Sequence, residues 1–162
     1  MTVQIQTISS LPNLPSIYAI YAIYAKSSKV PVYVGQTTKL KNRIIQHLIR
    51  RDSSIVTGAN GYSLNPDYVK KVSWWKHDLF TSPDNLIAAE LIAFKQLNPI
   101  IRSQGNKTQA NEISNDEDFT NEMVQLFQGE PSGELNIIDL TQALQRIAEL
   151  EDRIRQLEEK LK

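Results

Sequence analysis

The sequence predicts a small α/β domain, in which helices flank a three-stranded antiparallel sheet, followed by a C-terminal coiled-coil helix. Three observations predict this fold class. Two apolar, tyrosine-rich runs are joined by a short polar turn, a segment of helical period follows them directly, and a heptad pattern closes the chain. A chain of 162 residues is long enough to bury a hydrophobic core. We therefore divide it into a domain over 1–106, an acidic linker over 107–138 and a dimerisation helix over 139–162.

The first two strands are predicted over 17–24 and 30–34, because both runs are rich in Ile, Val and Tyr and a polar turn over 26–29 separates them. The second run stops at Gly35, and Thr37 or Thr38 is the predicted cap of the helix that follows. The apolar positions of this helix recur at helical spacing: Leu40, Ile44, Ile45, Leu48 and Ile49. Its other face is predicted to carry Lys39, Arg43, His47 and Arg50.

A long polar loop over 52–66 separates this helix from a third predicted strand over 68–77. Ser82 is the expected N-cap of the second long helix, which continues to about Leu97 and ends at Asn98-Pro99. This helix is apolar nearly all round and contains one carboxylate, Glu90. A carboxylate in such a helix is costly unless it is paired or binds a cation, so Glu90 is either a site residue or part of a structural ion pair.

The composition turns polar and acidic after Lys107, which is typical of a linker, with one short helix possible over 119–127. From Asp139 onwards a heptad repeat appears. Position a holds Leu140, Ile147, Ile154 and Leu161, and position d holds Ala143, Leu150 and Leu157. Ile at a and Leu at d favour two parallel strands, so we predict a homodimer. The alternative is an amphipathic helix that docks on its own domain.

The charge is asymmetric although the formal net charge is zero. Residues 1–107 hold 13 Lys/Arg and 5 Asp/Glu, a net of +8, whereas residues 108–162 hold 5 and 13, a net of −8. This asymmetry indicates a polyanion-binding part and an acidic part, with an unliganded basic surface as the alternative. The chain contains no cysteine, which excludes a disulfide scaffold, a thiolate zinc site and a cysteine nucleophile. No signal peptide or membrane span is recognisable, and we expect a cytoplasmic protein.

The residues near the first helix suit phosphodiester chemistry. The planar guanidinium of Arg43 matches a phosphate, and His47 is able to accept a proton from water. A tyrosine is a poor base unless nearby cations lower its pKa. Each residue alone has an ordinary structural explanation, as a strand aromatic or a solvated helix residue.

Together, Ser16-Ile17-Tyr18, Tyr33-Val34-Gly35, and Arg43 with His47 resemble the GIY-YIG endonuclease family over roughly residues 14–106. The resemblance implies that Tyr18, Tyr33 and Arg43 act on the scissile phosphate and that Glu90 binds Mg²⁺ or Mn²⁺. A histidine one turn after the arginine is similar to restriction-type members, which supports His47. Tyr21 and Tyr24, in the same run, are interpreted as strand aromatics.

Two departures from the family pattern stand out. Ser16 replaces the glycine of the first motif, and the position of the family's asparagine after the glutamate helix holds Arg102, with Asn106 the nearest asparagine. Either Asn106 takes that place or Arg102 binds phosphate instead.

The sequence therefore predicts a metal-dependent DNA endonuclease, a hydrolase acting on ester bonds, with RNA as an open alternative substrate. The other function class considered is a non-catalytic nucleic-acid-binding or regulatory module on the same scaffold. The residues expected to contact nucleic acid are Lys39, Lys41, Arg50, Arg51, Lys70, Lys71, Arg102 and Asn106.

Overall fold

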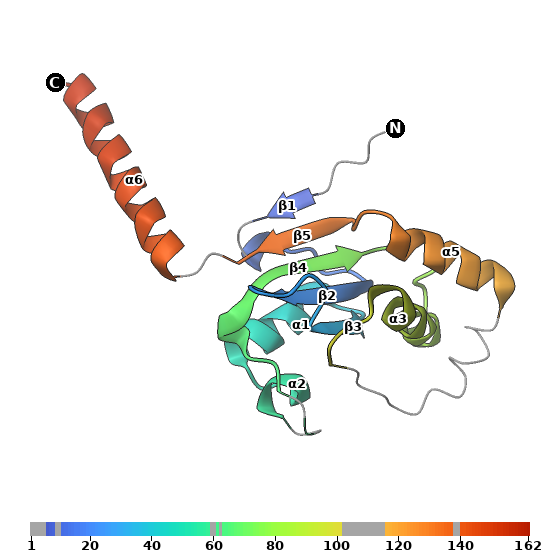
Figure 1. Cartoon of the computed structure of the whole chain (residues 1–162). Coiled ribbons are helices and arrows are strands. Elements are labelled where there is room, and N and C mark those ends of the chain that lie inside the picture. Colours follow the sequence, from blue (N-terminus) through green and yellow to red (C-terminus); the bar gives the residue numbers. More distant parts are fainter. Residues whose placement is uncertain (1–5, 9–10, 59–60, 62, 102–115, 138–139) are drawn as a thin grey trace.

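A computed structural model describes residues 6–8, 11–58, 61, 63–101, 116–137 and 140–162. It contains a sheet in the order β1-β5-β4-β2-β3, with helices on both faces (Figure 1). The strands are β1 (Gln6–Ile8), β2 (Ala19–Ala25), β3 (Tyr33–Thr37), β4 (Val69–Trp75) and β5 (Gly133–Asn136). The helices are η1 (Leu11–Asn13), α1 (Leu40–Ile45), η2 (Gln46–Arg50), α2 (Ser54–Thr57), η3 (Pro66–Tyr68), α3 (Pro83–Leu97), α5 (Glu117–Gln128) and α6 (Leu140–Lys160).

The antiparallel part of the sheet has four strands, so the predicted number of three is wrong, although the α/β class is confirmed. β2 pairs with β3 on one side, which is the predicted hairpin, and with β4 on the other. β5 then pairs antiparallel with β4, and β1 adds a parallel strand beside β5. β5 was missed because it is only four residues long, follows Pro131 and Ser132 directly, and contains a single large apolar residue, Leu135. Its pairing with β4 determines its conformation.

The two faces of the sheet carry two separate cores. On one face, α1 and η2 contribute Leu40, Ile44 and Leu48, which pack against alternate residues of β2 and β4. On the other face, α3 and α5 cover Ile20, Ala22, Val34 and Trp75. α3 begins and ends as predicted: Ser82 Oγ accepts a hydrogen bond from the Asn85 amide, and Asn98 ends the helix in the left-handed conformation with φ 51°.

The segment predicted to be a linker over 107–138 contributes to the folded domain in its second half. α5 coincides with the short helix considered over 119–127, and it buries Phe119, Met123 and Phe127 against the face of the sheet that holds Trp75. The Trp75 and Phe127 rings meet edge to face with centroids 5.6 Å apart. The linker assignment is therefore wrong for 116–137.

α6 stands apart from the sheet and its covering helices (Figure 1). From residue 143 onward its apolar side chains are not buried, and Ile147, Leu150 and Ile154 are each between 41% and 55% exposed. The alternative in which this helix docks on its own domain is thus not what the structure shows. Within the described part of the chain, no helix has the length and apolar character needed to cross a membrane.

Candidate active site

Tyr21 and Tyr33 lie diagonally across the β2–β3 hairpin on the face covered by α1. Tyr21 is opposite Gly35, Tyr33 is opposite Ile23, and the two phenol rings are 6.1 Å apart between centroids. A Cβ atom at Gly35 would lie 2.5 Å from the Tyr21 hydroxyl. The glycine of the second motif is therefore required because the Tyr21 ring lies directly over that position.

This arrangement corrects the prediction for Tyr18. Tyr18 precedes β2, is 41% exposed and does not join the cluster of Tyr21 and Tyr33. The sequence IYAIYAIYA repeats Ile-Tyr every three residues, so the motif can be aligned in more than one way. Because side chains alternate along a strand, a repeat of three sends successive tyrosines to opposite faces. Tyr21 faces α1, whereas Tyr24 lies on the other face, where the Lys71 ammonium is 4.7 Å from its ring centre.

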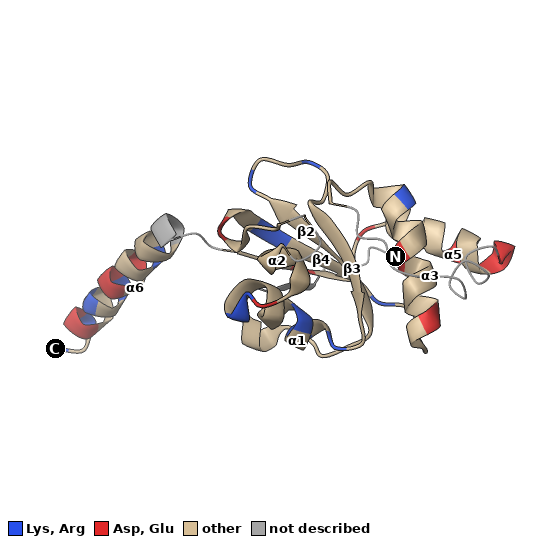
Figure 2. Cartoon of the chain, turned by 90° about the horizontal axis from the view of Figure 1, so that it is seen from below, with Lys and Arg blue, Asp and Glu red and all other residues tan. Residues whose placement is uncertain are grey.

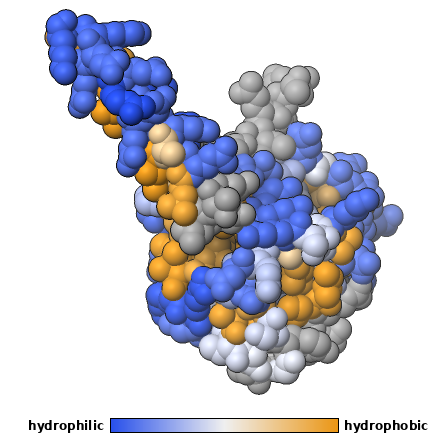
Figure 3. All heavy atoms as spheres, turned by 60° about the vertical axis from the view of Figure 1, so that its left-hand side comes forward, coloured by the Kyte–Doolittle hydropathy of each residue, from blue (hydrophilic) through white to orange (hydrophobic). Residues whose placement is uncertain are grey.

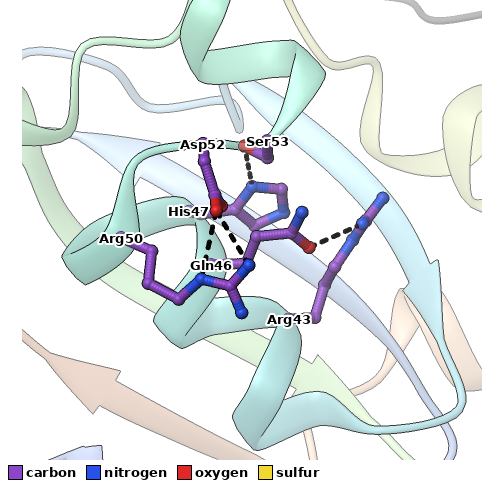
Figure 4. Close-up of polar contacts among 6 residues, drawn as sticks. All are labelled: Arg43, Gln46, His47, Arg50, Asp52 and Ser53. Atoms are coloured by element: carbon purple, nitrogen blue, oxygen red, sulfur yellow. Dashed lines mark hydrogen bonds and ion pairs between the residues drawn. The ribbon is translucent and has the colours of Figure 1, made fainter.

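Arg43 reaches the two tyrosines from α1. Its Nη1 donates to Gln46 Oε1 at 3.0 Å, whereas its buried Nε has no hydrogen-bond partner among the described residues (Figure 4). Burial raises the pKa of both Tyr21 and Tyr33. The positive charge of Arg43 and its hydrogen bonding offset part of this increase. An unpaired buried donor on a cation is costly, so this Nε–H is a group that a bound anion would satisfy.

His47 is fully buried, contrary to the prediction that it lies on the polar face of the helix. The reason is local: after Ile45 the helix continues as a π-helical turn, η2. The wider turn rotates the later residues relative to an α-helix, so that His47 faces the core while Ile49 is 62% exposed. The exposure of His47 and that of Ile49 are thus both the reverse of what a regular helical period predicts.

Both ring nitrogens of His47 have partners. Nε2 is 2.7 Å from the Tyr21 hydroxyl. Nδ1 is 2.8 Å from Ser53 Oγ, as Figure 4 shows. Burial, together with the nearby charge of Arg43, lowers the pKa of His47 from 6.5 to about 3. The imidazole is therefore neutral at physiological pH, and its two contacts fix the orientation of the ring.

Ser53 was missed by sequence reasoning. It is buried, with 2% of its surface exposed, and it immediately precedes α2. Its position before a short helix indicates an N-cap, but the structure shows no side-chain cap bond there, and the hydroxyl contacts His47 instead. No sequence pattern predicts a contact between a histidine and a serine six residues later, so this contact is visible only in the structure.

The two tyrosines have raised pKa values. Burial raises the pKa of Tyr21 well above 10, and the neighbouring Tyr33 adds to the effect. Burial also raises the pKa of Tyr33, and the negative charge of Glu90 is the next cause. Both phenols are therefore protonated at neutral pH in the free protein and are able to donate hydrogen bonds.

Glu90 acts on this cluster from the far side of the sheet. α3 packs on the opposite face, but β3 is the edge strand, and α3 lies beside it (Figure 1). Glu90 is partly buried, and its charge raises the pKa of both Tyr21 and Tyr33. Three of the five residues predicted at the site, Tyr33, Arg43 and His47, are thus in contact around Tyr21, and Glu90 acts on the two tyrosines through its charge.

The donor set is sparse in carboxylates and imidazoles. Among the described residues, no group of three or more His, Cys, Asp or Glu side chains is placed to hold a metal ion. A single carboxylate such as Glu90 is nevertheless compatible with Mg²⁺, which keeps several waters and is commonly held by one or two carboxylates plus substrate phosphate oxygens.

Several predicted nucleic-acid contacts are already paired with acids. Arg50 binds Asp52 at 2.8 Å, and Arg51 binds Asp67 at 2.9 Å. Lys71 lies on the opposite face from Tyr21, with its ammonium 4.0 Å from Glu134.

The remaining predicted contacts differ in accessibility. Lys39 and Lys70 are exposed, Lys41 is half-buried and donates to the Pro12 carbonyl, and Arg102 and Asn106 lie outside the described residues. Figure 2 shows Lys and Arg on α1 and near α2, whereas Asp and Glu lie on α5. Part of the basic surface therefore lies on α1, the helix that carries Arg43.

The site combines a hairpin that carries two neighbouring tyrosines, a glycine that makes room for one of them, and an arginine on the next helix. This combination is the geometry of one nuclease fold. Residues 17–103 match the family model described as the GIY-YIG catalytic domain. The chain belongs to the GIY-YIG nuclease family. No curated protein and no solved structure matches it. In this GIY-YIG chain, the tyrosine of the first motif that the structure places beside Tyr33 is Tyr21.

Proposed function

We propose that the chain is a metal-dependent endonuclease that hydrolyses phosphodiester bonds in DNA. The observation that supports this most directly is the Arg43 side chain. Its Nε–H is buried without a partner, beside two phenol hydroxyls that are protonated at neutral pH. The unpaired guanidinium donor suits a phosphate diester, because it finds an anionic oxygen there, while the phenols lie next to it.

Arg43 binds the scissile phosphate and stabilises the charge that develops on its non-bridging oxygens. Its guanidinium keeps its positive charge, because the pKa of an arginine lies far above neutral pH and that of Arg43 is raised further despite burial. The Gln46 contact at 3.0 Å fixes one end of the guanidinium and leaves Nε for the phosphate. Preorganised donors of this kind stabilise the transition state more than the ground state.

Tyr33 contacts the attacking water, because it is the less buried of the two phenols, with 8% of its surface exposed. Tyr21 lies between Tyr33 and His47 Nε2. When Ser53 accepts a hydrogen bond from Nδ1–H, Nε2 presents a lone pair to the Tyr21 hydroxyl. A water proton then reaches His47 through the phenols as the water oxygen bonds to phosphorus and the bond to the leaving 3′ or 5′ oxygen breaks.

The low pKa of His47 opposes this step in the free protein, and substrate relieves part of the opposition. One cause of the low value is the positive charge of Arg43. A phosphate bound to Arg43 offsets that charge, so it raises the pKa of His47 toward the range in which it accepts a proton. Substrate binding and activation of the water are therefore linked through Arg43.

Glu90 is the residue that would hold the divalent cation, Mg²⁺ or Mn²⁺, together with oxygens of the substrate. When bound, such an ion supplies Lewis-acid stabilisation of the leaving oxygen. A single carboxylate gives weak affinity in the absence of substrate, so we expect binding of the ion and of DNA to be cooperative.

The exposed basic residues on the Arg43 side, Lys39 and Lys70, contact the flanking DNA backbone. Because Arg50 and Arg51 are each paired with an aspartate, they contribute less to the affinity than their charge suggests.

The test is incubation of the purified chain with supercoiled plasmid and with a labelled RNA duplex, in Mg²⁺ and in EDTA. Mg²⁺-dependent nicking or linearisation of DNA supports the proposal, and preferential cleavage of RNA would replace the substrate. DNA binding without cleavage under any metal condition contradicts it and favours the non-catalytic binding module. An Arg43→Ala variant must lack any activity observed, since a contaminating nuclease is unaffected by it.

A further inference from the structure

α6 presents an apolar stripe that its own domain does not cover. The stripe consists of the exposed residues Leu144, Ile147, Leu150, Ile154, Leu157 and Leu161, each between 41% and 88% exposed. In Figure 3 the helix projects from the domain, with hydrophobic atoms on one side and hydrophilic atoms over most of the rest. Such a stripe on a helix that is otherwise polar indicates a missing partner.

We propose that this stripe binds the α6 helix of a second copy of the chain as a parallel, two-stranded coiled coil. Ile147 and Ile154 occupy position a, and Leu150 and Leu157 occupy position d, which is the combination that favours two parallel strands. The helix has 21 residues, or three heptads, and a length of about 31 Å at 1.5 Å per residue.

The charges beside the stripe select the same partner and the same orientation. In a parallel pair, position g faces position e of the following heptad in the partner, so Arg146 and Arg153 meet the glutamates at 151 and 158. In an antiparallel pair, g faces g and e faces e, so that like charges meet. Among the described residues, Arg153, Glu151 and Glu158 form no ion pair within the single chain.

The partner is thus a second copy, because the stripe matches itself in both shape and charge. Exposed ion pairs contribute little to stability, so the charges bias the orientation while the apolar stripe supplies the affinity. Three heptads are short, and we therefore expect a reversible dimer whose population depends on concentration.

Sedimentation velocity of the full chain from 1 to 200 μM tests the dimer. We expect a monomer–dimer equilibrium that Ile147→Asp with Ile154→Asp abolishes. The matched control, Gln145→Asp with Gln156→Asp, adds the same charge to the outer face and leaves the dimer intact. A wild-type monomer at 200 μM overturns the proposal, and so does a dimer that persists in the Ile147→Asp, Ile154→Asp variant, since its interface would lie elsewhere.

Charge exchange tests the orientation. One variant carries Arg146→Glu and Arg153→Glu, and the other carries Glu151→Arg and Glu158→Arg. In a parallel pair each variant alone repels itself, whereas an equimolar mixture forms a heterodimer. The chain has no cysteine, so Lys162→Cys provides a second readout: the parallel arrangement gives disulfide-linked dimers under mild oxidation at low micromolar concentration. Failure of both the mixture and the cross-link overturns the parallel arrangement.

Discussion

Exchange of Tyr21 for phenylalanine removes one hydroxyl from the centre of the proposed site. His47 Nε2, 2.7 Å from that hydroxyl, then lies buried with no replacement partner from the described residues. An unsatisfied buried polar group costs about 1–3 kcal/mol. For a chain of this length, each kcal/mol corresponds to a decrease of about 2–4 °C in the melting temperature, so we expect a loss of roughly 2–12 °C.

The effect on the rate is expected to be larger than the loss of stability explains. Loss of a group that positions or relays a proton typically lowers a rate by about 10²–10⁴-fold. The assay is single-turnover nicking of supercoiled plasmid at a temperature at which the variant remains folded. Tyr18→Phe is the matched control, because Tyr18 is exposed and starts the same strand run, and it should retain wild-type stability and rate. Normal cleavage by Tyr21→Phe, with loss of cleavage by Tyr18→Phe, would refute the reassignment of the first motif.

Three further predictions follow from the same contacts. Ser53→Ala should lower the rate of plasmid nicking tenfold or more, because the His47 ring loses the contact that fixes its orientation. The control is Ser54→Ala, a change at the exposed neighbour that should have no effect. Equal rates for the two variants would remove Ser53 from the site. Because the folded-state pKa of His47 is about 3, below the usual 6.5, the unfolded chain binds that proton more readily, and stability is lost as pH falls below about 6.5. Between pH 7 and pH 5 we expect His47 to lower the free energy of unfolding by about 2 kcal/mol, which urea unfolding measures. The His47→Gln variant should not show this part of the pH dependence. Arg43→Lys should restore little of the activity that Arg43→Ala loses, because an ammonium cannot replace the two-pronged guanidinium; full rescue would mean that a simple positive charge suffices.

We expect the affinity for DNA to reside in residues 1–107, which carry the net charge of +8. Affinity measured by fluorescence anisotropy should fall with rising salt as counterions are released, with a shallow slope because Arg50 and Arg51 are paired. Salt-independent binding would contradict the electrostatic argument.

The sheet and the second long helix are largely predictable from the sequence, because their signals are local. Strand runs bounded by turns give β2, β3 and β4, and Ser82 with Asn98-Pro99 gives the ends of α3. The position of Glu90 is also predictable, since a single carboxylate interrupts an apolar run.

The details of the site depend on three-dimensional contacts that no local signal encodes. The repeat of Ile-Tyr leaves the position of the first motif ambiguous. The structure decides in favour of Tyr21, because its ring lies over Gly35, where any side chain would clash with it. The π-helical turn at η2 reverses the expected exposure of His47, which a regular period of 3.6 residues cannot anticipate. Ser53 becomes a site residue only because the fold brings α2 next to His47.

The proposed dimer would give the proposed nuclease a further property. If two copies are joined through α6, two single-strand cutters are delivered to one duplex. Under the proposed function, the Ile147→Asp, Ile154→Asp variant should therefore still nick plasmid while making fewer double-strand breaks at equal enzyme concentration. The ratio of linear to nicked plasmid measures this, and an unchanged ratio would mean that dimerisation does not couple the two cuts.

The most direct test of the central claim is plasmid cleavage by Glu90→Gln in Mg²⁺, with DNA binding measured on the same preparation. The change keeps the size of the side chain and removes its charge, so the proposed metal ligand is lost while the Arg43 contacts remain. We expect cleavage to be abolished, as it is for the wild-type chain in EDTA, and DNA affinity to remain within a few-fold of wild type. Wild-type cleavage by Glu90→Gln, or by the wild-type chain in EDTA, would contradict the proposed metal-dependent mechanism.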